Sequence, residues 1–116
     1  FTKEPHLVYQ RGALCILTSR FEGAPLTVQE AMSYGCPVVS YDLRYGPADV
    51  ITDHVDGLLV TYGDRKAMAA TVVAALRDPE LLARMSAAAP KRAAEFGEAP
   101  FAARWSALFN EFAPKG

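Results

Sequence analysis

Short, unbroken apolar runs mark the first half of the chain. They occupy residues 13–18, 37–41 and 57–61, and the first of them reads Ala-Leu-Cys-Ile-Leu-Thr. A strand with one solvent-facing side alternates apolar and polar residues, and these runs do not alternate. Continuous runs of this kind are typical of strands that are buried on both faces of a parallel sheet. The pattern therefore predicts three short strands.

The segment between the first two runs has the spacing of a helix. Residues 25–34 begin with Pro25, which suits a first helical turn, and Gly35 and Pro37 follow as stop signals. The apolar positions of this helix are Leu26, Val28, Ala31 and Met32. A strand, a helix and a second buried strand form a right-handed crossover unit with parallel strands. We therefore predict an α/β fold: a partial Rossmann-like parallel sheet with flanking helices and a helical C-terminus.

The second half of the chain predicts helices with clear start signals. Asp64 precedes a segment with apolar residues at helical spacing, and Asp78 precedes Pro79. Each aspartate can therefore cap the helix that follows it. Pro90 lies inside the second of these helices, where a proline removes a backbone hydrogen bond, so we expect a kink there.

A last helix opens at Pro100 and has a strongly apolar side. Its large apolar residues follow the i, i+4, i+7, i+11 pattern and are Phe101, Trp105, Leu108 and Phe112. Such a side needs a partner surface. We expect it either to pack on another part of the protein or to form an exposed apolar patch that drives self-association.

Composition and charge narrow the class of protein. The chain has 116 residues, of which 51% are hydrophobic and 22% charged, an ordinary globular mixture that suffices for one domain. The formal net charge is −1 and no basic block occurs, so no nucleic-acid partner is expected. The apolar runs are far shorter than the ~20 residues of a membrane span, so no transmembrane segment is expected. Cys15 and Cys36 lack the spacing of a metal site and predict free thiols in a reducing cytoplasm.

Candidate chemistry lies where the first strand leads into the first helix, the usual ligand crevice of an open α/β sheet. Backbone amides suited to phosphate oxygens and sugar hydroxyls are those of Gly23, Ala24, Leu26 and Thr27. Glu22 and Glu30 flank these amides, and a carboxylate can accept hydrogen bonds from both hydroxyls of a sugar diol. Together these groups suit a nucleotide sugar. On spacing alone an alternative stays open, in which Glu22 caps the helix and Glu30 is a solvated surface residue.

The whole string resembles the signature of retaining glycosyltransferase family 4, the group 1 enzymes of GT-B architecture. The family pattern reads S-x-x-E-G-x-P-x-x-x-x-E-A-M-x-x-G-x-P-V-V. The chain matches it in register at Ser19, Glu22, Gly23, Pro25, Glu30, Ala31, Met32, Gly35, Pro37, Val38 and Val39. Residues 42–60 resemble the loop, short helix and final strand of the same domain, with His54 at a glycine position. Tyr45-Gly46-Pro47 is similar to the branch that includes poly(glycerol-phosphate) α-glucosyltransferases.

The resemblance implies that residues 1–116 are the C-terminal portion of a GT-B donor-binding domain, without the N-terminal acceptor domain and inactive alone. The full-length enzyme would be a retaining, metal-independent hexosyltransferase without cofactors, in the cytoplasm or at the inner face of the membrane. Its donor would be a nucleotide-diphosphate sugar, in particular a UDP-sugar, and its acceptor a cell-envelope glycan, a polyol-phosphate polymer or a similar molecule.

The resemblance also implies roles for single residues. Glu22 would be the catalytic residue, in contact with the transferred sugar beside the reacting carbon, and Glu30 would hold the ribose. The amides of Gly23, Ala24, Leu26 and Thr27 would bind the sugar and diphosphate of the donor. An alternative is a non-catalytic nucleotide-sugar-binding or protein-interaction domain that kept the fold. Outside the motif, His6, Arg44 and His54 are expected to be surface or turn residues.

Overall fold

The computed structural model describes residues 2–19, 26–43 and 46–113. In chain order the elements are α1 (Pro5–Arg11), β1 (Cys15–Leu17), α2 (Leu26–Ser33), β2 (Val38–Asp42), α3 (Pro47–Val50), β3 (Gly57–Thr61), α4 (Arg65–Leu76), α5 (Pro79–Ala94) and α6 (Glu98–Phe112). The three strands form one sheet in the order β1-β2-β3, and both pairings are parallel. The predicted α/β class and the three parallel strands are confirmed.

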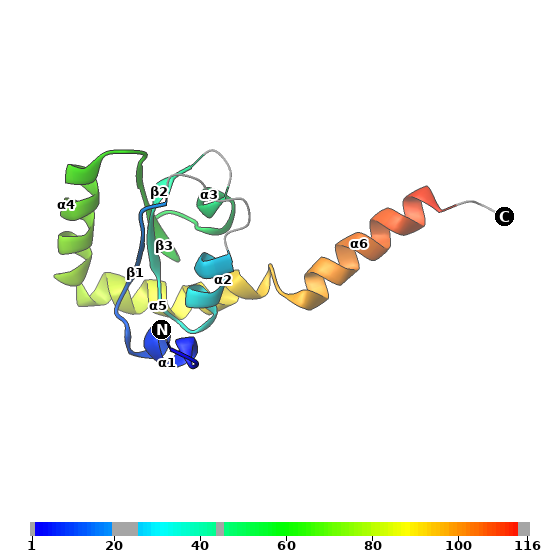
Figure 1. Ribbon diagram of the computed structural model, residues 1–116, viewed down its shortest axis with the longest axis horizontal. Coiled ribbons are helices and arrows are strands. Elements are labelled where there is room, and N and C mark those ends of the chain that lie inside the picture. Colours follow the sequence, from blue (N-terminus) through cyan, green and yellow to red (C-terminus); the bar gives the residue numbers. More distant parts are fainter. Residues whose placement is uncertain (1, 20–25, 44–45, 114–116) are drawn as a thin grey trace.

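Helices cover both faces of the sheet, with α4 on one side and α2 and α3 on the other (Figure 1). Strand β2 lies between its two neighbours and is buried along Val38–Tyr41, which explains its lack of polar alternation. The cluster on the α2 side, called the α2 core, consists of Val28, Ala31, Met32, Cys36, Val38, Val50, Ile51, Ala89 and Ala93. The α4 core consists of Val39, Tyr41, Leu43, Leu58, Val60, Met68, Ala75 and Met85.

Helix α5 joins these two cores. Met85, in its first half, belongs to the α4 core, whereas Ala89 and Ala93 belong to the α2 core. Between them, the Ser86 hydroxyl donates a 2.7 Å hydrogen bond to the carbonyl of Gly35, just beyond the end of α2. Helix α5 continues through Pro90 to Ala94. Its position therefore couples the helices on the two faces of the sheet.

The starts of α4 and α5 are found where the two aspartates predicted them. The Asp64 carboxylate accepts a 2.9 Å hydrogen bond from the Ala67 amide, and the Asp78 carboxylate accepts a 3.0 Å hydrogen bond from the Leu81 amide. Helix α6, in contrast, begins at Glu98, two residues before the predicted start at Pro100, because the first turn of a helix accommodates a proline that lacks the amide hydrogen. The helix expected over 25–34 is α2, and it ends at Ser33, one residue earlier than expected. Gly35 follows with a φ of 77°, a conformation that glycine adopts without steric cost.

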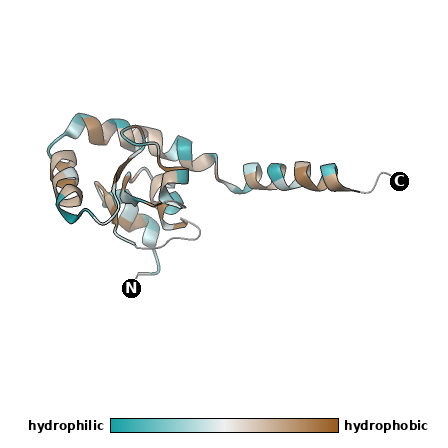
Figure 2. Ribbon diagram, turned by 90° about the horizontal axis from the view of Figure 1, so that it is seen from above, coloured by the Kyte–Doolittle hydropathy of each residue, from teal (hydrophilic) through white to brown (hydrophobic). Residues whose placement is uncertain are grey.

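Helix α6 extends away from the body of the molecule, with the described C-terminal end far from the sheet (Figure 1). None of its residues is buried. Apolar segments recur along the projecting helix (Figure 2). The exposed apolar patch that was one expected outcome for this helix is confirmed.

Two further features complete the fold. Helix α1 was not predicted from the sequence, and its Tyr9 ring stacks on that of Tyr34, with centroids 6.3 Å apart. In the part of the chain that the structure describes, no helix has both the length and the apolar character that crossing a membrane requires.

Candidate functional site

The candidate site lies at one edge of the sheet, where the parallel strands end. β1 ends at Leu17 and β2 at Asp42, and α2 begins at Leu26 on the return path from β1. The carboxyl ends of parallel strands share one edge, and ligands of open α/β sheets bind in the crevice outside it. In Figure 1 this edge is beside α3 and the first turn of α2.

The first turns of α2 bring together three of the predicted site residues. Leu26, Thr27 and Glu30 are all exposed, and the Leu26 side chain and backbone together have a relative exposure of 67%. Leu26 and Glu30 are four residues apart and so share one side of the helix. Burial on the opposite side holds α2 in place, because Val28 and Met32 are fully buried in the α2 core. The exposed Glu30 and the first described residues of α2, Leu26 and Thr27, therefore lie within the first turns of one helix.

Glu22, Gly23 and Ala24 lie outside the described residues, as does Arg44. Their predicted roles therefore remain predictions. The two ends of the strand–helix connection are described, at Ser19 and at Leu26.

Helix α3, the next helix along the chain, packs against α2, and Val28 and Val50 belong to the same core. Gly46 starts α3 with a φ of 121°, which is a conformation open to glycine. Its amide donates a 3.0 Å hydrogen bond to the Asp49 carboxylate. This contact closes the first turn of α3.

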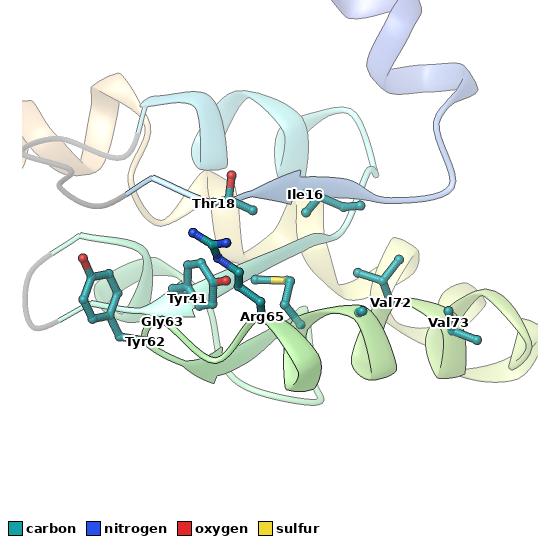
Figure 3. A pocket seen from close by; sticks show the side chains of 10 residues that line it. Ile16, Thr18, Tyr41, Tyr62, Gly63, Arg65, Val72 and Val73 are labelled. Atoms are coloured by element: carbon teal, nitrogen blue, oxygen red, sulfur yellow. The ribbon is translucent and has the colours of Figure 1, made fainter.

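A separate groove of about 860 Å³ lies between β1 and α4 (Figure 3). Its lining is mainly apolar and includes Ile16, Met68 and Val72, and Arg65 extends across it toward Thr18. Tyr41 and Tyr62 close one end with an edge-to-face contact, centroids 5.8 Å apart. The groove is on the face of the sheet opposite to α2, and Thr18, Tyr62 and Gly63 bring one end of it to the edge where β1 and β3 end.

The cysteines are poor candidates for nucleophiles. Both are free thiols, and burial raises the pKa of Cys36 to about 11, with a smaller contribution from Cys15. Burial also raises the pKa of Cys15. Because the thiolate is the reactive form, both thiols are unreactive near neutral pH.

The described geometry is that of an open α/β domain, in which α2 begins at the edge where the parallel strands end and carries the exposed carboxylate of Glu30. A family model described as "Glycosyl transferases group 1" matches residues 1–92. The chain belongs to this family, as the motif predicted.

Relatives of the chain include two glycosyltransferases named for polyol-phosphate polymers. The chain is 30% identical over 111 residues to the poly(glycerol-phosphate) alpha-glucosyltransferase of Bacillus subtilis (strain 168), covering 96% of this chain and 16% of that protein. It is also 30% identical over 111 residues to the poly(ribitol-phosphate) alpha-N-acetylglucosaminyltransferase of Staphylococcus aureus (strain COL), covering 95% of this chain and 22% of that protein. The chain thus spans between 16% and 22% of the length of these relatives.

Solved structures show the same fold. A complex of S. aureus TarM with fondaparinux, alpha-GlcNAc-glycerol and UDP superposes with a TM-score of 0.86 at 30% identity, covering 95% of this chain and 22% of that chain. The lipopolysaccharide outer core galactosyltransferase WaaB superposes with a TM-score of 0.71 at 29% identity, covering 96% of this chain and 32% of that chain. The predicted membership in a GT-B architecture is confirmed.

Proposed function

We propose that the chain is the distal part of the nucleotide-sugar-binding domain of a retaining hexosyltransferase, and that the parent enzyme carries the acceptor domain. The observation that carries this proposal is the family match together with Leu26, Thr27 and Glu30 at the sheet edge. The donor is a UDP-sugar, which the presence of UDP in the similar TarM complex supports. The acceptor is a cell-envelope glycan or a polyol-phosphate polymer, as in the relatives named above.

Different residues bind different parts of the donor. Glu30 accepts hydrogen bonds from the ribose hydroxyls, because an exposed carboxylate can take both hydrogens of a diol. The amides of Leu26 and Thr27, with those of Gly23 and Ala24, bind the sugar and diphosphate. Glu22 contacts the transferred sugar beside its anomeric carbon and is the catalytic residue.

The transfer step follows from this division. The bond between the anomeric carbon and the diphosphate oxygen breaks, and an acceptor hydroxyl oxygen bonds to the same face of that carbon. Negative charge grows on the departing diphosphate, where backbone amides and the amino end of α2 stabilise it. The acceptor proton passes to the departing diphosphate, so no metal ion or further cofactor is needed and Glu22 is not a covalent nucleophile.

Two substitutions in the full-length enzyme test these roles. We expect Glu30→Gln to raise the KM for the UDP-sugar on the order of tenfold, because one ribose contact is lost. We expect Glu22→Gln to lower kcat on the order of a hundredfold with a smaller change in KM. Initial rates at varied donor concentration measure both. Glu111→Gln, which removes an exposed carboxylate on α6, serves as the charge-matched control.

Unchanged kinetics in both variants would contradict the assigned roles. The alternative, a non-catalytic nucleotide-sugar-binding or protein-interaction domain, makes a different prediction. In that case the full-length protein with native Glu22 and Glu30 binds UDP-sugar or a protein partner in calorimetry but transfers no sugar.

We also infer two properties of the molecule as a whole. The exposed apolar side of α6 drives association between copies of this chain. The enzyme works in the cytoplasm, at the inner face of the membrane, where free thiols such as Cys15 and Cys36 persist.

A further inference from the structure

Arg92 connects two elements that are far apart in the sequence. From the second half of α5, its Nε donates a 2.7 Å hydrogen bond to the carbonyl of Val50, and its Nη2 donates a 3.1 Å hydrogen bond to the carbonyl of Asp49. Both carbonyls belong to the last residues of α3. A guanidinium is well suited to this place, because the carboxyl end of a helix carries unpaired carbonyls and partial negative charge.

Neighbouring side chains orient the guanidinium. Its Nη1 pairs with the Glu95 carboxylate, and its central carbon lies 4.9 Å from the centroid of the Phe96 ring. The Arg92 side chain retains 29% of its exposure, so it is partly withdrawn from water. Ion pairing and cation–π contact limit the rotamers of Arg92 and favour the orientation that reaches α3.

The contacts of Arg92 continue to the sheet edge through Asp49. The Asp49 carbonyl accepts from Arg92, and the carboxylate of the same residue accepts from the Gly46 amide. Gly46 is the first described residue after Leu43 and starts α3. Arg92 is therefore connected through Asp49 to Gly46, which starts α3 beside the predicted donor site.

Helix α3 depends on such outside support. It has only four residues, and a single helical turn is unstable by itself because nucleation costs more than one hydrogen bond returns. Its described anchors are Pro47 and Val50, which are buried, and the two carbonyl contacts of Arg92. Apolar burial fixes the depth of α3, whereas the directed hydrogen bonds fix its orientation.

We propose that Arg92 is a positioning residue for donor binding: from α5 it holds α3, and with it Gly46 at the start of α3, in the orientation that receives the nucleotide sugar. Arg92 itself does not contact the donor. This inference rests on the proposed function, because it assumes that the sheet edge binds a nucleotide sugar.

Amide hydrogen exchange tests the hold on α3 without any substrate. We expect Arg92→Leu to speed exchange on the order of tenfold at amides that close this turn, those of Gly46, Asp49 and Ile51. Amides of α4 should be unchanged. Arg92→Lys, which keeps the charge but cannot donate to both carbonyls in the same fork, should show a smaller increase. Arg84→Gln, an exposed arginine on the same helix, is the control and should change nothing.

Steady-state kinetics of the full-length enzyme test the link to the donor. We expect Arg92→Leu to raise the donor KM on the order of tenfold with kcat within about twofold, and Arg92→Lys to rescue part of the loss. Faster exchange with an unchanged KM would overturn the role in donor binding. Unchanged exchange would overturn the hold on α3.

The two measurements separate the two proposals. If the wild-type enzyme transfers no sugar, the proposed function fails, and exchange still decides whether Arg92 holds α3. If Arg92→Leu fails to fold, Arg92→Lys replaces it in both measurements, with the same outcomes deciding.

Discussion

His54 adopts a backbone conformation that residues with a Cβ disfavour. It has a φ of 63°, and its amide donates a 2.9 Å hydrogen bond to the carbonyl of Gly57. The imidazole is exposed and lies 3.0 Å from the Asp53 carboxylate, a pair that contributes little in water. The expectation of a surface turn residue is confirmed. The strain also explains why the family pattern favours glycine here.

Replacing His54 with glycine should stabilise the fold. The left-handed conformation costs a residue with a Cβ about 1–2 kcal/mol, and the greater freedom of glycine in the unfolded chain returns part of this. We expect His54→Gly to raise the free energy of unfolding by about 0.5 kcal/mol, measured by urea denaturation. His54→Ala, which keeps the Cβ and removes the ring, should give no such gain. A loss of stability in His54→Gly would show that the ring contributes more than the strain costs.

At the scale of elements, α5 connects several separate parts of the fold. It contributes to both cores, its Leu81 amide donates a hydrogen bond to the Asp78 cap, and its Arg92 donates to α3. Its start was predicted because the cap Asp78 and the first-turn proline Pro79 lie next to one another in the sequence. Its contacts with α3 were not predicted, because Arg92 and Val50 are separated by 42 positions and only the fold brings them together.

Removal of the α5 cap should be measurable. We expect Asp78→Ala to lower the free energy of unfolding by about 1 kcal/mol, because the Leu81 amide loses its acceptor. Asp78→Asn retains a side-chain oxygen that can accept the same hydrogen bond and should lose much less. Thermal or urea unfolding checks both. Equal losses in the two variants would assign the effect to charge rather than to the cap.

Helix α1 illustrates the opposite case, an element without an apolar side. Pro5 begins it and Gly12 follows its last residue, but it has no side-chain cap and none of its residues is buried. Ring contacts of His6 and Tyr9 with Tyr34 connect it to the end of α2. A helix stabilised by neighbours rather than by its own pattern cannot be found from periodicity.

At the scale of the whole molecule, the chain measures 61 × 30 × 29 Å, and α6 projects from its body (Figure 1). Phe101, Trp105 and Phe109 form a continuous aromatic series with ring centroids 6.0 and 5.5 Å apart. Trp105 is 44% and Phe112 is 74% exposed. So much apolar area in contact with water favours association.

We expect the 116-residue chain to associate with a concentration dependence visible in sedimentation velocity. Phe109→Glu should shift the distribution toward monomer, because a charge in a buried apolar interface is strongly unfavourable. The control is Asn110→Glu, which adds the same charge on the same exposed helix and should have a smaller effect. Phe96→Glu is not a suitable control, because Phe96 packs against the α2 core. A monomer at high concentration that binds no apolar dye would refute association through α6.

The amino-acid sequence alone determined the local features of this protein. These features are the three apolar strands, the two aspartate caps, the end of α2 and the family motif. Each depends on neighbours within a few positions, through backbone hydrogen bonds and side-chain periodicity. Tertiary structure decided which side of α2 faces the crevice, that Arg92 reaches α3, and that the apolar side of α6 is exposed. These depend on which distant surfaces meet, and burial and directed hydrogen bonds between remote segments acquire their energies only once the chain has folded.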